Sequence, residues 1–213
     1  YADVSKVFVG TFGGGIYEST DNGINWSKSN SGYCGQAINE FAMTSTSIFA
    51  ATPNGVYKST DGGETWTESN NGLESSNGNV HNVFSITASG DTLYAGTQDM
   101  GAYKSIDNGA TWTAVNNGLL WFGSQSILSM KAAGTTIFAG TYGVGIYRSV
   151  DGGNNWVQTI SGLAHQVVES IVFMGSDVYC SQWNGISKST DNGNTWVSVN
   201  NVAGVYQLAV SGN

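Results

Sequence analysis

The sequence predicts an all-β protein, a five-bladed β-propeller of four-stranded antiparallel blades. Three observations support this prediction. The 213 residues include 30 glycines, one proline and 12% aromatic residues, a composition typical of turn-rich β proteins. A phrase first seen as STDNGINW at 19–26 occurs five times. Its aspartates are 40, 46, 44 and 40 residues apart, and this period indicates four short strands per repeat.

Each repeat contains the same strands, here named A to D. In the second repeat strand A is INEFAMT (38–44), B is IFAAT (48–52), C is VYKS (56–59), and D begins at Trp66. The whole chain, 1–213, is predicted to be one domain. Its blades are expected at 38–70, 82–116, 126–160 and 169–200, and the fifth is assembled from 6–30 and 205–213.

The two ends of the chain complement one another. The sequence starts at a B strand, 6–11, and finishes with an A strand, 205–211. Counting from Asp191 through the end and on to Asp21 gives 43 residues, which matches the period. We therefore expect the C-terminal strand to pair with the N-terminal blade, closing the ring and removing free sheet edges.

The repeated phrase has the chemistry of a structural turn. Its Asp accepts hydrogen bonds from nearby backbone N–H groups, its Gly adopts positive φ, and its Trp offers a large apolar surface for the space between blades. These structural residues are Asp21, Asp61, Asp107, Asp151, Asp191, Trp26, Trp66, Trp112, Trp156 and Trp196. The further oxygen ligands of an EF-hand calcium loop are missing, so no metal is expected there.

The phrase S-x-D-x-G-x-[TN]-W resembles the Asp-box, or BNR repeat, in all five copies. Asp-boxes occur in sialidase-like propellers, xyloglucanase-type glycosidases, sortilin-like receptors and photosystem assembly factors. The resemblance implies that the boxes lie at the C-to-D turns, on the face opposite the binding or catalytic face. The B-to-C and D-to-A connections would then share the functional face.

These other connections vary from repeat to repeat. The B-to-C loops read FGGG, PNG, QDMG, YGVG and QWNG. Exposed aromatic rings among amide and hydroxyl side chains are typical of sugar-binding surfaces. The candidate ligand-binding residues are Trp183, Asn184, Gln182, Tyr142, Phe12, Trp121, Phe122, Asp99 and Tyr33. For the stretch around Trp121, plugging the ring mouth or packing on a neighbouring blade is an equal alternative.

Composition and residue counts exclude several functions. The net charge of -8 disfavours nucleic acid as a partner, and no apolar run is long enough to insert into a membrane. Sialidases hold their substrate carboxylate with three arginines, whereas this chain contains one, Arg148. His81 and His165 form no metal-binding motif, and we expect no cofactor. Cys180 replaces small residues of other repeats and is expected to be buried, while Cys34 has no such counterpart.

The leading hypothesis is a non-enzymatic recognition or scaffold module of a secreted or surface bacterial protein. It would bind a glycan or a protein partner through the variable face. One alternative is a glycoside hydrolase that uses two of the four acids near that face, Asp99, Glu74, Glu40 and Glu169. Another is a purely structural adhesin or assembly subunit. The first residues, YADVSK, lack an initiator Met, so we expect a processed chain or a domain excerpt.

Overall fold

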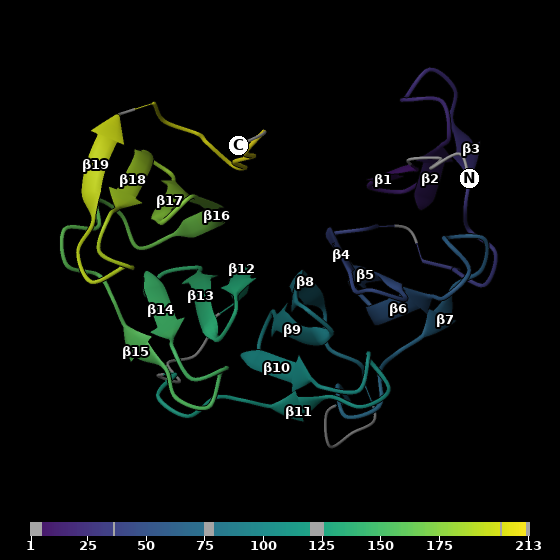
Figure 1. Cartoon of the computed structure of the whole chain (residues 1–213), viewed down its shortest axis with the longest axis horizontal. Coiled ribbons are helices and arrows are strands. Elements are labelled where there is room, and N and C mark those ends of the chain that lie inside the picture. The colour runs from purple at the N-terminus through teal and green to yellow at the C-terminus, as the bar shows by residue number, and fades with distance from the viewer. Residues whose placement is uncertain (1–5, 36, 75–78, 120–125, 201, 212–213) are drawn as a thin grey trace.

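The computed structural model describes residues 6–35, 37–74, 79–119, 126–200 and 202–211. These residues form five antiparallel sheets that follow one another around an arc (Figure 1). No helix occurs among them. The composition and the repeat therefore predict the all-β propeller correctly, and the fold is five-bladed.

Each sheet follows the chain, from the inside of the arc to the outside. The first sheet has three strands, β1 (Val7–Gly10), β2 (Ile16–Ser19) and β3 (Ser27–Lys28). The second contains β4 (Glu40–Met43), β5 (Ile48–Thr52), β6 (Gly55–Ser59) and β7 (Thr67–Glu68). The third contains β8 (Val83–Ser89), β9 (Thr92–Thr97), β10 (Ala102–Ser105) and β11 (Thr113–Ala114).

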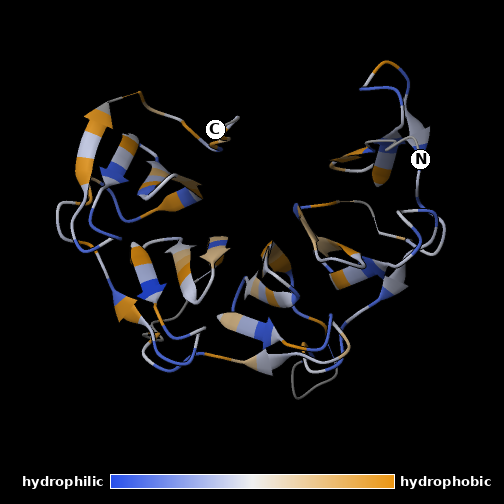
Figure 2. Ribbon diagram, in the orientation of Figure 1, coloured by the Kyte–Doolittle hydropathy of each residue, from blue (hydrophilic) through white to orange (hydrophobic). Residues whose placement is uncertain are grey.

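The last two sheets repeat this pattern. The fourth contains β12 (Ile127–Ala133), β13 (Thr136–Thr141), β14 (Ile146–Ser149) and β15 (Val157–Gln158). The fifth contains β16 (Val168–Met174), β17 (Asp177–Gln182), β18 (Gly185–Ser189) and β19 (Val197–Asn200). Residues of opposite hydropathy alternate along many of these strands (Figure 2), as expected where the two faces of a strand meet different neighbours.

The core lies between adjacent blades. The second strand of each four-stranded sheet is almost fully buried, and β5 is buried at all five positions. Its small residues, Ala50, Ala95, Ala139 and Cys180, are inaccessible to solvent. Cys180 is therefore the small buried residue that the repeat predicts, and burial raises the pKa of its thiol to about 12. Cys34 is exposed, and neither cysteine forms a disulfide.

The predicted pairing of the C-terminal strand with the first blade is not formed in this structure. Residues 202–211 have no assigned strand, and β1 pairs only with β2 among the described residues. The C-terminal segment lies by the fifth blade, and the ends of the arc stay apart (Figure 1). Each blade is placed by its contacts with the blade before it, and those contacts do not bring β1 next to residues 205–211.

The Asp-box turns match the structure expected of them. Asp61 lies between β6 and β7, at the predicted C-to-D turn. Its Oδ1 accepts the N–H of Thr65 at 2.9 Å and the hydroxyl of Ser59 at 2.7 Å. The Ser59 hydroxyl oxygen in turn accepts the N–H of Gly63, whose φ is 94°. The other four boxes make the same aspartate contacts.

The box tryptophans link each blade to the preceding one. Trp66 donates its backbone N–H to Ser31 O at 2.8 Å, and Trp112 donates to Asn71 O at 2.8 Å. The indole N–H of Trp112 also bonds to Ser69 O of the preceding blade. Trp66, Trp112, Trp156 and Trp196 are 1–4% exposed, whereas Trp26 is 42% exposed and bonds within its own turn, to Gly23 O. Trp26 differs because no blade precedes it in this structure.

We expect the box aspartates to make stability depend on acid pH. Hydrogen bonds to the carboxylate lower the pKa of Asp61 from 3.8 to about 2, and the four other box aspartates shift equally. A depressed folded-state pKa stabilises the fold above pH 3.8, and this contribution is lost as pH falls towards 2. The melting-temperature gap between wild type and Asp61→Asn should therefore shrink from pH 4 to pH 2. A gap that does not change with pH would contradict this assignment.

The two kinds of box tryptophan should differ in their contribution to stability. Removing a fully buried Trp side chain costs about 3–5 kcal/mol, so Trp66→Ala should lower the free energy of unfolding by that amount. Trp26→Ala should cost less than half as much, because its ring is 42% exposed and contacts no preceding blade. Urea unfolding of both variants, with Trp66→Phe as a volume control, measures the difference. Equal losses would show that the preceding blade contributes little.

Candidate functional site

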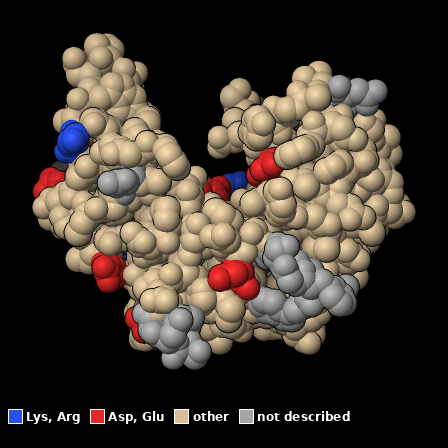
Figure 3. Space-filling model, turned by 180° about the vertical axis from the view of Figure 1, so that it is seen from behind, with Lys and Arg blue, Asp and Glu red and all other residues tan. Residues whose placement is uncertain are grey.

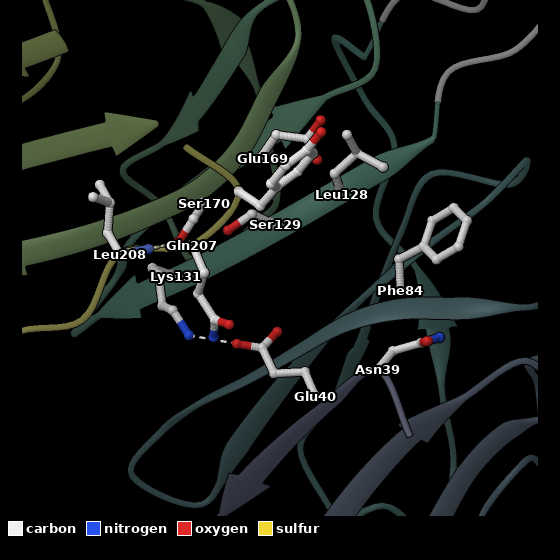
Figure 4. Close-up of a pocket in the computed structure, with 11 residues that line it drawn as sticks. Asn39, Glu40, Phe84, Leu128, Ser129, Lys131, Glu169, Ser170, Gln207 and Leu208 are labelled. Carbon is white, nitrogen blue, oxygen red and sulfur yellow. Dashed lines mark hydrogen bonds and ion pairs between the residues drawn. The ribbon is translucent and has the colours of Figure 1, made fainter. Parts of the chain in front are cut away.

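The inner strands of the blades line a polar pocket at the centre of the arc (Figure 4). Its volume is about 200 Å³. Successive inner segments contribute residues at two equivalent positions. The first position supplies Asn39, Phe84, Leu128, Glu169 and Tyr206, and the second supplies Glu40, Ser129, Ser170 and Gln207. The pocket therefore results from the repeat, but its chemistry varies from blade to blade.

One ion pair crosses this pocket. Lys131 on β12 donates to Glu40 on β4 at 2.5 Å. The two strands belong to different blades, and the blade that contains β8 lies between them. Glu40 also accepts the N–H of Ile86 on the intervening β8 at 3.0 Å. Burial outweighs the attraction of Lys131 and raises the pKa of Glu40 above its ordinary value. This pair joins three blades and places a partly desolvated carboxylate at the pocket wall.

Trp183 lies beside the pocket, in the hairpin between β17 and β18. Its indole N–H donates to Glu169 Oε1 at 3.1 Å, and Glu169 lines the pocket. The ring lies parallel to that of His165, with the centroids 6.3 Å apart and the planes 7° apart. The Trp183 side chain is 54% exposed. The indole is thus fixed in direction by two neighbours while much of its surface faces solvent.

The residues flanking Trp183 hold the hairpin in place. Gln182 is buried, donating to His165 O at 2.6 Å and accepting from the Ser187 hydroxyl at 2.8 Å. Asn184 donates to Ala164 O at 3.4 Å. The N–H of Gly204 bonds to Trp183 O, which links the hairpin to the C-terminal segment. Gln182 is 0% exposed, so it positions the loop and does not face a ligand.

The structure separates the remaining aromatic candidates. Phe12 is fully exposed beside a second depression that Gly13, Cys34 and Pro53 also line. Tyr142 is 54% exposed, and its backbone forms an isolated antiparallel β-bridge with Val167. Trp121 and Phe122 lie outside the described residues. Among the described candidates, Phe12 thus lies beside a different depression from the pocket next to Trp183.

Tyr33 corrects the sequence-based expectation of an exposed ring. It is 6% exposed, donates its hydroxyl to Ala37 O at 2.8 Å and packs edge-on against Tyr57. The ring belongs to the core between the first two blades. In the sequence, a Tyr in a variable connection looks like a ligand contact. In the structure, the ring of Tyr33 packs in the core instead.

The four acids near this face have different surroundings. Asp99 accepts from His81 Nδ1 at 3.1 Å, with the His side chain 7% exposed and the Asp side chain 66% exposed. Glu74 is exposed, and its backbone forms an isolated antiparallel β-bridge with Val80. Glu40 and Glu169 line the same pocket. Of the four acids, these two are the pair that the fold brings into one cavity.

Sequence reasoning missed Lys131, Tyr206 and Gln207. A signal for Lys131 existed, because the equivalent positions of the other inner segments carry Ala42, Thr87, Val172 and Ala209. A charged residue in such a strand needs a partner. The partner itself, Glu40, is 91 residues away and could not be paired from the sequence.

The described residues contain neither a cluster of metal ligands nor a membrane-spanning helix. In this part of the chain, no three His, Cys, Asp or Glu side chains cluster closely enough to hold a metal ion. The same residues contain no helix with the length and apolarity needed to cross a membrane.

Acidic side chains are scattered over the face shown in Figure 3, where basic ones are few.

Comparison with known proteins supports the box assignment. A family model described as the BNR/Asp-box repeat matches residues 17–28 and 57–68. No curated protein sequence matches the chain. Many solved structures resemble it, and the three described next are 17–21% identical to this chain, which shows the fold alone.

Three solved structures illustrate the likeness. The Niastella koreensis GH74 enzyme is 21% identical with a TM-score of 0.67, over 93% of this chain and 30% of that one. The extracellular domain of a hybrid two-component system from B. thetaiotaomicron is 17% identical with a TM-score of 0.71, over 86% and 26%. YCF48 bound to D1 peptide is 20% identical with a TM-score of 0.61, over 80% and 56%.

The chain spans less than two thirds of the length of each of these structures. The likeness in fold agrees with the box turns, the four-stranded blades and the inter-blade tryptophans described above. The chain is a β-propeller, and its residues 17–28 and 57–68 match the BNR/Asp-box repeat.

Proposed function

We propose that this propeller is a non-enzymatic recognition module that binds a glycan at the pocket mouth, with Trp183 as the principal contact. The observation that carries the proposal is the fixed but exposed indole beside a polar pocket. Sugar rings stack their C–H faces on aromatic surfaces, and amide and carboxylate side chains accept their hydroxyl hydrogens. Asn39, Glu169 and Gln207 supply such groups within the pocket.

The size and polarity of the pocket favour a small part of a glycan over a large apolar ligand. A volume of about 200 Å³ holds roughly one sugar ring, and ligand pockets for drug-sized molecules are larger, at about 300–1,000 Å³. The chain has only seven Lys and Arg residues and a net charge of -8, which favours a neutral ligand over an anionic one. The proposal places the protein outside the cell, as a secreted or surface component, and the extracellular domain among its structural neighbours supports this location.

Trp183→Ala should weaken glycan binding by about tenfold. A stacking contact contributes about 1 kcal/mol to binding, and the substitution also removes apolar surface that the ligand would bury. Together these losses correspond to about a tenfold weaker affinity. A glycan array with the wild-type protein identifies a ligand, and calorimetry with that ligand measures the two affinities. The matched control is Ile106→Ala, which removes an exposed apolar side chain from an Asp-box turn on the opposite face.

Both variants should keep the wild-type melting temperature within a few degrees, since both side chains are more than half exposed. Unchanged glycan affinity for Trp183→Ala would contradict the site. Absence of any array ligand, together with capture of a peptide that competes at Trp183, would favour a protein partner instead.

Glycoside hydrolysis is the second candidate, because Glu40 and Glu169 line one pocket and GH74 enzymes share the fold. Hydrolysis of oligosaccharides by the wild type, reduced at least a hundredfold in Glu169→Gln, would support this function. Binding without turnover in the same assay would support the recognition module.

A further inference from the structure

Glu169 carries a charge that its position in the scaffold does not require. The equivalent positions of the other inner segments carry an amide, two apolar side chains and a phenol, namely Asn39, Phe84, Leu128 and Tyr206. Among the described residues, the carboxylate of Glu169 makes one hydrogen bond, in which Oε1 accepts the indole N–H of Trp183 at 3.1 Å. A neutral amide oxygen could accept that N–H as well. The negative charge is therefore not needed to hold the indole.

No Lys or Arg within the described residues neutralises this carboxylate. Figure 4 shows the ammonium of Lys131 directed at Glu40, which it meets at 2.5 Å, and away from Glu169. The other six Lys and Arg side chains of the chain contact groups elsewhere. Because Glu40 and Lys131 offset one another, the pocket lining keeps the negative charge of Glu169.

The nearby imidazole does not supply a cation either. His165 Nδ1 accepts the backbone N–H of Val167 at 3.0 Å, so this nitrogen carries no proton and the ring is neutral. Glu169 itself is half-buried. A half-buried carboxylate without a cation beside it is unfavourable, and a ligand that brings a cation relieves that cost.

The carboxylate and the indole are arranged so that one ligand can contact both. The bond from the indole N–H places Glu169 at the edge of the Trp183 ring, while the ring itself is exposed to solvent. The second carboxylate oxygen, Oε2, has no hydrogen bond within the part of the chain that the structure describes. A sugar stacked on the indole can therefore direct a ring substituent past the edge of the indole to Oε2.

We infer that the ligand of this site is an amino sugar with a free, protonated amine, an inference that rests on the glycan-binding function proposed above. The sugar ring stacks on Trp183, and its ammonium donates to Glu169. Charge-assisted hydrogen bonds are roughly twice as strong as neutral ones, and the negative face of an indole also attracts a nearby cation. The net charge of -8 adds a long-range attraction for cations.

Three trisaccharides with the same linkage test the inference, built from glucosamine, N-acetylglucosamine or glucose. They differ only in carrying an ammonium, an acetamide or a hydroxyl group at one ring carbon. By calorimetry at about pH 6, where the sugar amine is protonated, the wild type should bind the glucosamine trimer about tenfold more tightly than the other two. This preference should shrink when the salt concentration rises from about 0.05 M to about 0.5 M.

Glu169→Gln removes the charge and keeps an oxygen for the Trp183 indole N–H. It should abolish the preference, so that the three trimers bind within about threefold of one another. The matched control is Glu64→Gln, which removes the same charge from an exposed position in an Asp-box turn on the opposite face. This control should keep the preference. Both variants should melt within a few degrees of the wild type, since neither substitution empties a buried site.

Two outcomes overturn the inference while leaving the glycan site in place. One is equal affinity of the wild type for the three trimers, with Trp183→Ala weakening all of them. The other is a preference for the glucosamine trimer that persists in Glu169→Gln. Failure of every trimer and every array glycan to bind, or binding of a lysine-containing peptide in their place, overturns this inference together with the glycan-binding function.

Discussion

The structure depends on the contact by which each box tryptophan joins its own blade to the one before it. A four-stranded sheet of this size has little core of its own, and the apolar clusters of this molecule combine residues from adjacent blades. The backbone N–H and the indole of the Trp both bond to the preceding blade, so the ring cannot move without the sheet. The aspartate turn supports this by holding the Trp at a fixed distance from the third strand.

The same contact explains why the two ends of the chain differ from the middle. Trp26 has no preceding blade and stays exposed, while residues 205–211 keep the inner-strand position without a sheet to join. In repeat architectures the terminal units either carry altered surfaces or pair with one another. In this structure Val202 replaces a repeated Gly in the last blade and β1 keeps an exposed apolar edge in the first, and the two do not pair among the described residues.

The candidate site results from small departures within the repeat. The inner strands supply equivalent positions to one pocket, and the scaffold accommodates Glu40, Ser129 and Ser170 at the same place because each accepts the N–H of the next inner segment. Glu40 and Lys131 use this tolerance to place a charge pair at the centre of the molecule. Trp183 adds an aromatic surface from a loop whose equivalents in the other blades carry Phe12, Pro53, Asp99 and Tyr142.

The sequence by itself determined the all-β class, the number of blades and the role of the box residues, because these follow from local hydrogen bonding and from a period that recurs five times. It also indicated Trp183 as an exposed ring. Only the tertiary structure decided that Tyr33 is buried, that Gln182 is committed to the scaffold, and that Glu40 meets Lys131. Those outcomes depend on contacts between strands many residues apart. The angle between blades is likewise a property of packed surfaces, so the spacing of the boxes could suggest a closed ring while the structure leaves its ends unpaired.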